Sequence, residues 1–153
     1  WTRLDERASW FYEAVSAAAD MSPKRPGTAS STYLGVYRDA AGEWLDGGHA
    51  YRLRVPPDAP ANLFWSVTVY DVYTLCLILN DQQIADRSSR MDLKRNADGS
   101  VDIWCAPTPP EGFEQNWIPT VPGKNWFAYF RLYEPTQPYF DASWPLPDFE
   151  RMD

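Results

Sequence analysis

The residues best suited to chemistry in this sequence lie in one polar segment, residues 80–90. Asp86, Arg87 and Arg90 fall close together there, and serines separate the two arginines. Two guanidinium groups with hydroxyls between them can bind a carboxylate or a sulfate. The alternative is internal, with one arginine pairing with Asp71 or Asp86 and ordering the loop. The spacing leaves both interpretations open.

Loop carboxylates offer a second chemistry, the cleavage of glycans by a hydrolase or a lyase. Asp71, Asp81 or Asp86 could act with His49 or Tyr73. Glycosidases place two carboxyl groups about 5–9 Å apart across the bond that breaks. The sequence fixes no such distance, and its 21 acidic residues make chance pairing common. Whether the protein is an enzyme therefore stays open, and no catalytic residue is assigned.

Metal and cofactor binding are not predicted. The chain has two cysteines, Cys76 and Cys105, and a single histidine, His49, which together form no zinc-binding pattern. We expect two buried free thiols. A disulfide between them stays an alternative, because spacing alone does not establish the geometry of the bond. No Gly-x-Ser-x-Gly elbow accompanies His49, so a serine nucleophile of that type is not indicated.

Amide and aromatic side chains extend the set of candidates. An amide such as that of Gln83 can both donate and accept hydrogen bonds. Flat aromatic rings suit sugar faces and protein interfaces equally, and the pattern puts Trp44, Trp104 and Trp117 outward or in loops. The candidate ligand-binding residues are Asp71, Tyr73, Asp81, Gln83, Asp86, Arg87, Arg90 and His49.

The element that must position these residues is the segment 62–71, Asn-Leu-Phe-Trp-Ser-Val-Thr-Val-Tyr-Asp. Its aromatic and β-branched residues favour a strand. Neither face of that strand carries a charge before Asp71, which predicts a central strand covered on both sides. The chain then runs toward the polar segment 80–90. We expect any functional site at this exit.

Alternation and turn signals predict five further strands, at residues 33–38, 49–55, 75–79, 100–105 and 125–133. A short edge strand at 91–95 would form a hairpin with 100–105, because Asp98-Gly99 suits a tight turn.

Two other segments flank these strands. Apolar residues at helical spacing predict one helix at 4–19, and the tail 134–153 carries prolines and aromatic residues that should wrap around the body. The predicted fold class is mainly β: an antiparallel β-sandwich, jelly-roll-like, preceded by one N-terminal helix.

Size and charge narrow the classes of partner. The 153 residues suit one domain, and the net charge is −7 with a pI of about 4.6. An acidic surface repels phosphate groups, which argues against nucleic acid. No apolar run approaches the ~18 residues of a membrane span.

Several motifs resemble a known family. They are Tyr33-x-x-x-Tyr37-Arg38-Asp39, Trp44-Leu-Asp-Gly-Gly48, Tyr51-Arg-Leu-Arg-Val-Pro56, Phe64-Trp-Ser-Val-Thr-Val-Tyr-Asp71, Asn96-x-Asp-Gly-Ser-Val101, Asn116-Trp117 and Arg131-Leu-Tyr133. From about Tyr33 to Asp148 the chain resembles domain-of-unknown-function family 1214, the C-terminal domain of bacterial proteins that carry family 1254 in front of it.

The resemblance implies a jelly-roll-like sandwich, export to the periplasm or secretion, and no established reaction. Residues 1–32 would be a helical linker and residues 33–153 the sandwich domain, as the C-terminal part of a longer protein. A cytoplasmic location stays open. The expected partners are the preceding domain of the same protein or a second chain, further copies in a homo-oligomer, and a carbohydrate or small polar ligand.

Three functional hypotheses result. The first is a β-sandwich module of an exported protein that packs on a partner domain and helps form a polar, glycan-binding cleft. The second is a glycan-acting hydrolase or lyase that uses the loop carboxylates. The third is a purely structural or oligomerisation domain.

Overall fold

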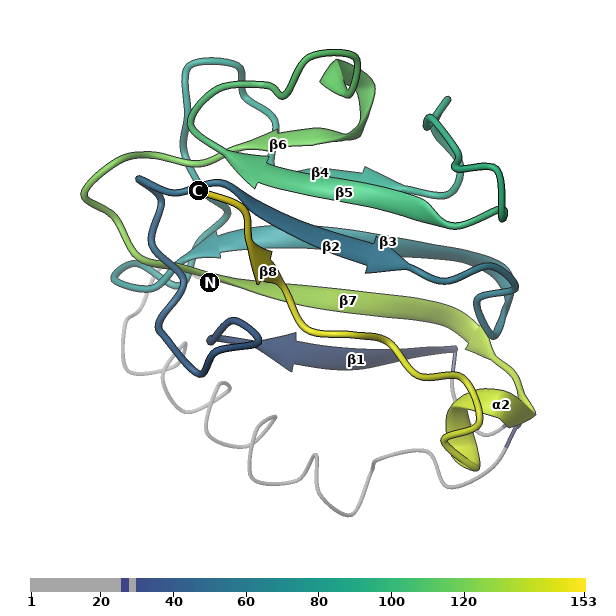
Figure 1. The fold of residues 1–153 in the computed structure, drawn as a ribbon. Coiled ribbons are helices and arrows are strands. Elements are labelled where there is room, and N and C mark those ends of the chain that lie inside the picture. Colours follow the sequence, from purple (N-terminus) through teal and green to yellow (C-terminus); the bar gives the residue numbers. More distant parts are fainter. Residues whose placement is uncertain (1–25, 28–29) are drawn as a thin grey trace, which may run out of the picture.

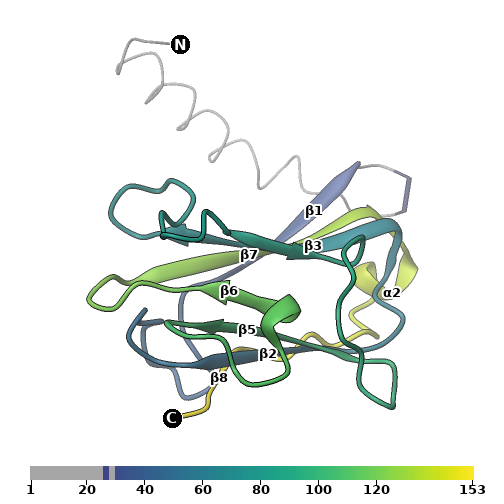
Figure 2. The same ribbon diagram turned by 90° about the horizontal axis from the view of Figure 1, so that it is seen from above.

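The computed structural model describes residues 26–27 and 30–153, and these form two four-stranded sheets packed as two layers (Figures 1 and 2). Sheet I has the order β1 (Ser31–Val36), β7 (Trp126–Pro135), β3 (Ala61–Asp71), β4 (Asp86–Ser88). Sheet II has the order β6 (Trp117–Pro119), β5 (Val101–Ala106), β2 (Tyr51–Val55), β8 (Glu150–Arg151). The mainly β fold is confirmed, whereas the predicted helix at 4–19 lies outside the described residues.

The prediction of a central strand at 62–71 is confirmed by β3. This strand lies between β7 and β4 and pairs antiparallel with both. Its inward side chains, Trp65, Val67 and Val69, are buried in the core between the sheets. The predicted strands at 33–38, 49–55, 100–105 and 125–133 correspond to β1, β2, β5 and β7.

Sheet II departs from the predicted all-antiparallel pattern, because β5 and β6 run parallel. The chain reaches β6 through a proline-rich loop and a short 3₁₀ helix, η1 (Glu114–Asn116). Asn116 is fully buried and accepts a hydrogen bond from the backbone N–H of Lys94, while its amide donates to the carbonyls of Lys94 and Asp102. The jelly-roll topology is not supported by this strand order.

Two predicted strands are wrong. Residues 75–79 make only an isolated bridge, between Tyr70 and Leu77, because the chain reverses directly after β3 and Leu75 takes a positive φ of 56°. Residues 91–95 form no strand either, because the backbone N–H and C=O of Lys94 form hydrogen bonds with the side chain of Asn116. The turn expected between 96 and 99 is nevertheless present.

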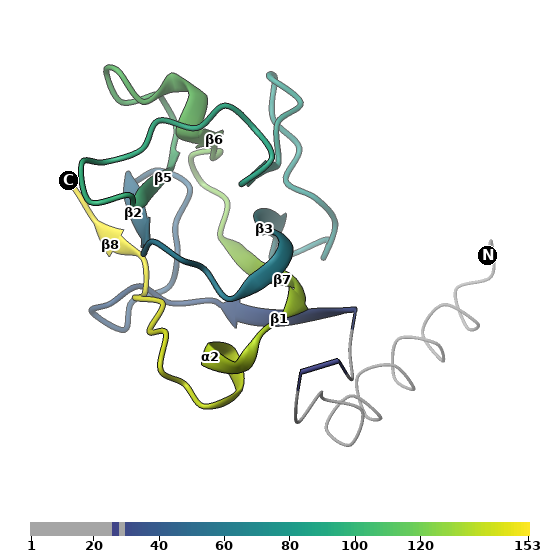
Figure 3. The same ribbon diagram turned by 90° about the vertical axis from the view of Figure 1, so that its right-hand side faces the viewer.

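The tail crosses from sheet I to sheet II along one open side of the sandwich, passing from α2 (Gln137–Phe140) to β8 (Figure 3). Tyr139 and Trp144 pack against the core, and Phe149 is buried in it. The hydroxyl of Thr32 also donates to that of Tyr139, at 2.6 Å. The predicted wrapping of the tail around the body is therefore confirmed.

The structure also corrects the predicted burial of one cysteine and one tryptophan. Both thiols are free, but only Cys105 is buried, and burial raises the pKa of its thiol. Cys76 is exposed, contrary to the expectation of two buried thiols, because it belongs to the reversal after β3. Trp117, predicted to point outward or lie in a loop, is buried in β6, and its indole N–H donates to the carbonyl of Ala106.

Candidate functional site

The outer face of sheet I carries an unusual layer of aromatic side chains. The inner positions of β7 and β3 fill the core, so the alternate positions point away from it. β1 adds its own outward positions at the sheet edge. We call this layer the aromatic face; it consists of Tyr33, Tyr37, Phe64, Tyr70, Phe127, Tyr129 and Tyr133.

Ring-on-ring contacts order the aromatic face. Phe64 stacks on Tyr133 with 4.0 Å between ring centroids. Phe127 stacks on Tyr70 on one side and on Tyr37 on the other, at 5.2 Å and 5.0 Å. Such pairs stabilise a fold by about 0.5–1.5 kcal/mol beyond their area burial. The rings are therefore held in place before any partner arrives.

Glycine at position 35 makes room for this layer. It lies opposite Tyr129 in the pairing of β1 with β7. A Cβ atom at position 35 would come within 3.1 Å of the Tyr129 ring. Burial raises the pKa of the Tyr129 phenol, and its hydrogen bond with Tyr37 raises this pKa further. Tyr129 is accordingly a neutral, fixed element of the face.

Arg131 sits at the centre of the aromatic face. Its guanidinium donates to the hydroxyl of Thr68 at 2.7 Å and to the hydroxyl of Tyr70. It also lies 5.1 to 5.6 Å from the ring centroids of Tyr33, Tyr70 and Tyr129. Within the described residues no carboxylate lies within 4.0 Å of it. Its charge is thus balanced by hydroxyls and π-systems, which leaves it able to meet an acidic or aromatic group from outside.

The two arginines of the polar segment point to different neighbours. Arg90 lies over the ring of Phe64, at 3.9 Å from its centroid, and so joins the edge of the aromatic face. Arg87, in β4, donates to the backbone carbonyls of Gln115 and Asp86, and burial lowers its pKa. These contacts give Arg87 a role in ordering the chain around β4. Neither arginine forms an ion pair among the described residues.

Asp71 ends β3 and shapes the reversal that follows. Its carboxylate accepts the backbone N–H groups of Tyr73 and Thr74 at 2.8 and 2.9 Å. The bond from Thr74, the bond from Tyr73 and the charge of Lys124, whose Nζ lies 3.7 Å away, hold the pKa of Asp71 below its ordinary value. Asp71 is therefore a turn cap, while the side chain of Tyr73 extends from this turn with 93% of its surface exposed.

The reversal exposes three leucines, and one of them lies beside the aromatic face. Leu75, Leu77 and Leu79 are 57%, 55% and 77% exposed, and we call these three the leucine loop. The bridge between Tyr70 and Leu77 places these two residues opposite one another, and opposed residues share a face of the sheet. Leu77 therefore widens the aromatic face beside the last residues of β3.

The remaining predicted site residues lie apart from this face or at the surface. Nδ1 of His49 lies 3.1 Å from the carboxylate of Asp153 and 2.8 Å from the guanidinium of Arg151, beside β8 of sheet II. Asp81 and Gln83 are exposed in the connection from β3 to β4. In the described part of the chain, no hydrogen bond or ion pair joins His49 to any predicted carboxylate of the site. A common ligand site for these residues stays a prediction.

Residues 26–27 and 30–153 contain no group of three or more histidine, cysteine or acidic side chains placed to hold a metal ion. Among the same residues, no helix is both long enough and apolar enough to cross a membrane.

The fold and this face define a two-sheet β domain, and comparison with known proteins gives its family. The family described as "Protein of unknown function (DUF1214)" matches residues 30–137, and the chain belongs to it. The resemblance to family 1214 inferred from the motifs is therefore confirmed, while a family 1254 domain in front of it stays a prediction. No curated protein matches the sequence.

Two solved structures share the fold. VPA0106 from Vibrio parahaemolyticus superposes with a TM-score of 0.73 at 21% identity, over 95% of this chain and 43% of that one. An uncharacterised protein from Burkholderia cenocepacia superposes with a TM-score of 0.59 at 17% identity, over 81% of this chain and 30% of that one. The chain thus spans less than half the length of either protein.

Sequence reasoning missed the centre of this face. It singled out Trp44, Trp104 and Trp117 as aromatics that point outward or lie in loops, and it named Arg131 only within a family motif, without a role. The available signal was the alternation along 125–133, which puts three aromatic residues and Arg131 on one side of a strand whose other side is also apolar.

Proposed function

We propose that this domain is an interaction module, and that the aromatic face and the leucine loop pack against a partner protein domain. The observation that carries the proposal is Arg131, held among tyrosine rings on a largely aromatic surface, with no carboxylate partner among the described residues. Aromatic residues and arginine are the residue types most enriched at protein interfaces and at their energetic centres. A purely solvated sheet face does not need them.

The leucine loop supports the same function. Three exposed leucines beside an aromatic layer form the kind of apolar patch that marks contact sites. Tyr33 and Tyr37, which are 55% and 44% exposed, supply the phenol groups of the patch. Tyrosine combines a large apolar ring with a hydrogen-bonding tip, so it tolerates both the free and the bound state.

We further propose that the occupant is the domain that accompanies this one in longer relatives. Both solved structures continue well beyond the matched part, which makes up 43% and 30% of their chains. A second copy of this chain is the other protein occupant, and the experiment below distinguishes it by mass. Export to the periplasm, which the family resemblance implies, belongs to the same proposal.

A glycan is a second candidate ligand for this face, because exposed Tyr33 and Tyr37 offer flat rings to a sugar. A bound glycan would change the mass of the protein only slightly. A protein partner would add the mass of a domain or of a second chain.

Native mass spectrometry of the protein expressed from its own gene tests the proposal. The double variant Tyr33→Ser/Leu77→Ser removes two exposed side chains of the face. It should release the partner domain, after limited proteolysis of the linker where both domains belong to one chain. The matched control Arg52→Ser/Arg54→Ser alters the outer face of sheet II and should leave the complex intact. An unchanged complex in the first variant, or a wild-type protein free of any partner domain, would overturn the proposal.

A further inference from the structure

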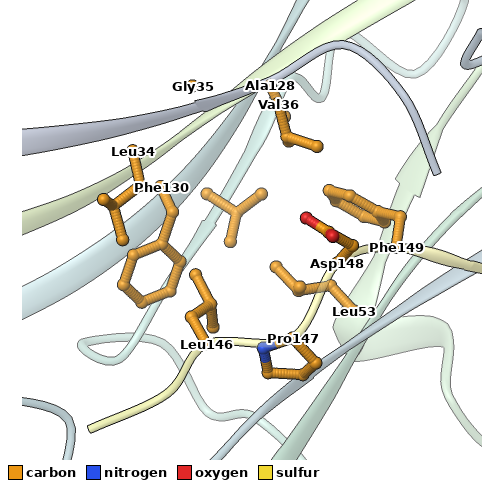
Figure 4. Close-up of a pocket in the computed structure, with 11 residues that line it drawn as sticks. Leu34, Gly35, Val36, Leu53, Ala128, Phe130, Leu146, Pro147, Asp148 and Phe149 are labelled. Atoms are coloured by element: carbon orange, nitrogen blue, oxygen red, sulfur yellow. The ribbon is translucent and has the colours of Figure 1, made fainter. Parts of the chain in front are cut away.

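A cavity of about 240 Å³ lies between the two sheets, on the side where β1 and β8 form the sheet edges. Four strands and the tail supply its apolar walls, among them Leu34, Leu53, Val67, Phe130 and Leu146 (Figure 4). Native interiors rarely leave a void much larger than a water molecule. An engineered apolar cavity of about 150 Å³ already binds benzene in another protein. This space is therefore large enough for a phenyl ring or a short alkyl chain.

The course of the tail explains why the cavity exists. The segment that closes this side is fixed at both ends: the indole N–H of Trp144 donates to the carbonyl of Pro57, and the carbonyl of Phe149 accepts the N–H of Ala40. Between these anchors Pro147 lacks an N–H for a strand ladder. The segment therefore spans the gap without pairing with β1, and the space beneath it stays unfilled.

One charged group lines the cavity, the carboxylate of Asp148. Figure 4 shows it pointing into the space that the apolar side chains surround. Within residues 26–27 and 30–153, it makes no hydrogen bond and no ion pair. An exposed carboxylate in water needs no partner, but this one stands where an apolar cavity meets the solvent.

A cation that lines a surface hollow together with Asp148 already has other partners. Asp148 also borders a shallow hollow that Arg38 and Trp44 line. The guanidinium of Arg38 lies 4.0 Å from the centroid of the Trp44 ring and donates to the carbonyl of Gly42 at 2.7 Å. The negative charge of Asp148 is therefore available to a ligand.

We propose that this cavity binds a small amphipathic amine, with a phenyl ring or short alkyl group between the sheets and a protonated ammonium on Asp148. The walls give the apolar part a dry environment, and burial of apolar surface drives its entry. A hydrogen bond between an ammonium and a carboxylate is about twice as strong as a neutral one, so the cation is favoured over a neutral analogue. An anionic ligand would meet the like charge of Asp148 and of a chain with a net charge of −7.

Titration of the intact protein with 2-phenylethylamine and with its neutral analogue 2-phenylethanol tests this site. Methyl NMR shifts of Leu34, Leu53 and Val67 locate the probe on the wild-type protein. For a ligand of this size we expect the amine to have a dissociation constant of about 1 mM. The alcohol should bind roughly tenfold more weakly. Equal affinities, or no methyl shift at about 10 mM probe, would overturn the proposal.

Variants separate the two parts of the site. Asp148→Asn should weaken amine binding about tenfold, to the level of the alcohol, without changing alcohol binding. Asp141→Asn is the matched control on the same tail, because its carboxylate accepts the N–H of Ser143 and lines no part of the cavity. Val36→Phe should fill the cavity and abolish binding of both probes. Unchanged amine affinity in Asp148→Asn would contradict the role of the carboxylate whether or not Val36→Phe folds.

Discussion

The outer faces of the two sheets differ in the groups that surround their arginine side chains. On sheet II, Arg52 pairs with Glu150 and Arg54 pairs with Asp98 at 2.9 Å, so these charges satisfy one another at the surface. On sheet I, Arg131 has tyrosine rings and hydroxyls around it and no carboxylate among the described residues. In the first arrangement each of these two arginines has a carboxylate partner.

The second arrangement is stable alone but keeps apolar area and a cation at the surface. Long-lived exposure of such area is uncommon in proteins that act alone. The difference supports the proposal that sheet I, and not sheet II, packs against a partner. Variants on the two faces should therefore differ in both stability and association.

The largest effect is expected for Arg131→Ala. The variant loses hydrogen bonds to Thr68 and Tyr70 and leaves their hydroxyls unpaired. The free energy of unfolding should fall by about 1–3 kcal/mol, because hydrogen bonds to charged groups are worth about that much. Urea denaturation measures the change. Arg131→Lys should recover only part of it, since an ammonium lacks the planar fork of a guanidinium. Wild-type stability in Arg131→Ala would show that Arg131 does not hold the aromatic face together.

Acid titration compares the carboxylates that shape a turn at each sheet. Asp71 has a lowered pKa in the folded protein, so its stabilising effect is full above the unfolded value of about 3.9 and is lost as pH falls through the folded pKa. The Ser100 hydroxyl and N–H, with Arg54, lower the pKa of Asp98 to about 2, which extends its window from about pH 4 down to about pH 2.

Urea midpoints measured from pH 6 to pH 2 test this expectation. Asp71→Asn should flatten the acid-side loss of stability that begins near pH 4. Asp98→Asn should flatten it mainly at the lower end of the range. A wild-type acid profile in Asp71→Asn would show that the turn cap does not depend on the charge of Asp71.

A smaller loss of stability is expected from substitutions on the outer face of sheet II. Arg52→Ala removes a partly exposed ion pair with Glu150, and such pairs contribute about 0–1 kcal/mol. A double-mutant cycle with Glu150→Ala measures the coupling between the two side chains. A coupling as large as the loss in Arg131→Ala would erase the contrast between the faces.

The smallest change in stability is expected for Leu75→Ser/Leu77→Ser. Both side chains are mostly exposed, so the free energy of unfolding should stay within about 0.5 kcal/mol of wild type. Association of the domain should nevertheless weaken, which sedimentation velocity detects. A large loss of stability would mean that the leucine loop serves the fold instead of a partner.

The strands that sequence could predict are those whose own residues decide their conformation. β3 is rich in aromatic and β-branched residues, and β2 alternates Tyr51, Leu53 and Val55 with arginines, so both were predictable. Residues 75–79 were mispredicted because an apolar run usually indicates burial, whereas here Asp71 caps a reversal that turns the leucines outward.

The parallel pairing of β6 depends on contacts distant in sequence. The side-chain amide of Asn116 donates to the backbone carbonyls of Lys94 and Asp102. The local sequence of the proline-rich loop does not predict these hydrogen bonds. The site was predictable only in part. Arg90 lies at the edge of the aromatic face, whereas Asp71 only caps the turn after β3. The role of Arg131 depends on β1, β7 and β3 lying side by side, which the sequence alone does not show.

Site-specific photo-cross-linking tests the docking of sheet I most directly. A photoreactive phenylalanine analogue at position 33 or 77 reports on the aromatic face and the leucine loop, and the same analogue at position 54 reports on sheet II. We predict that positions 33 and 77 both cross-link to one partner domain while position 54 gives no product. Equal yields from the two sheets, or no product from positions 33 and 77, would contradict the account.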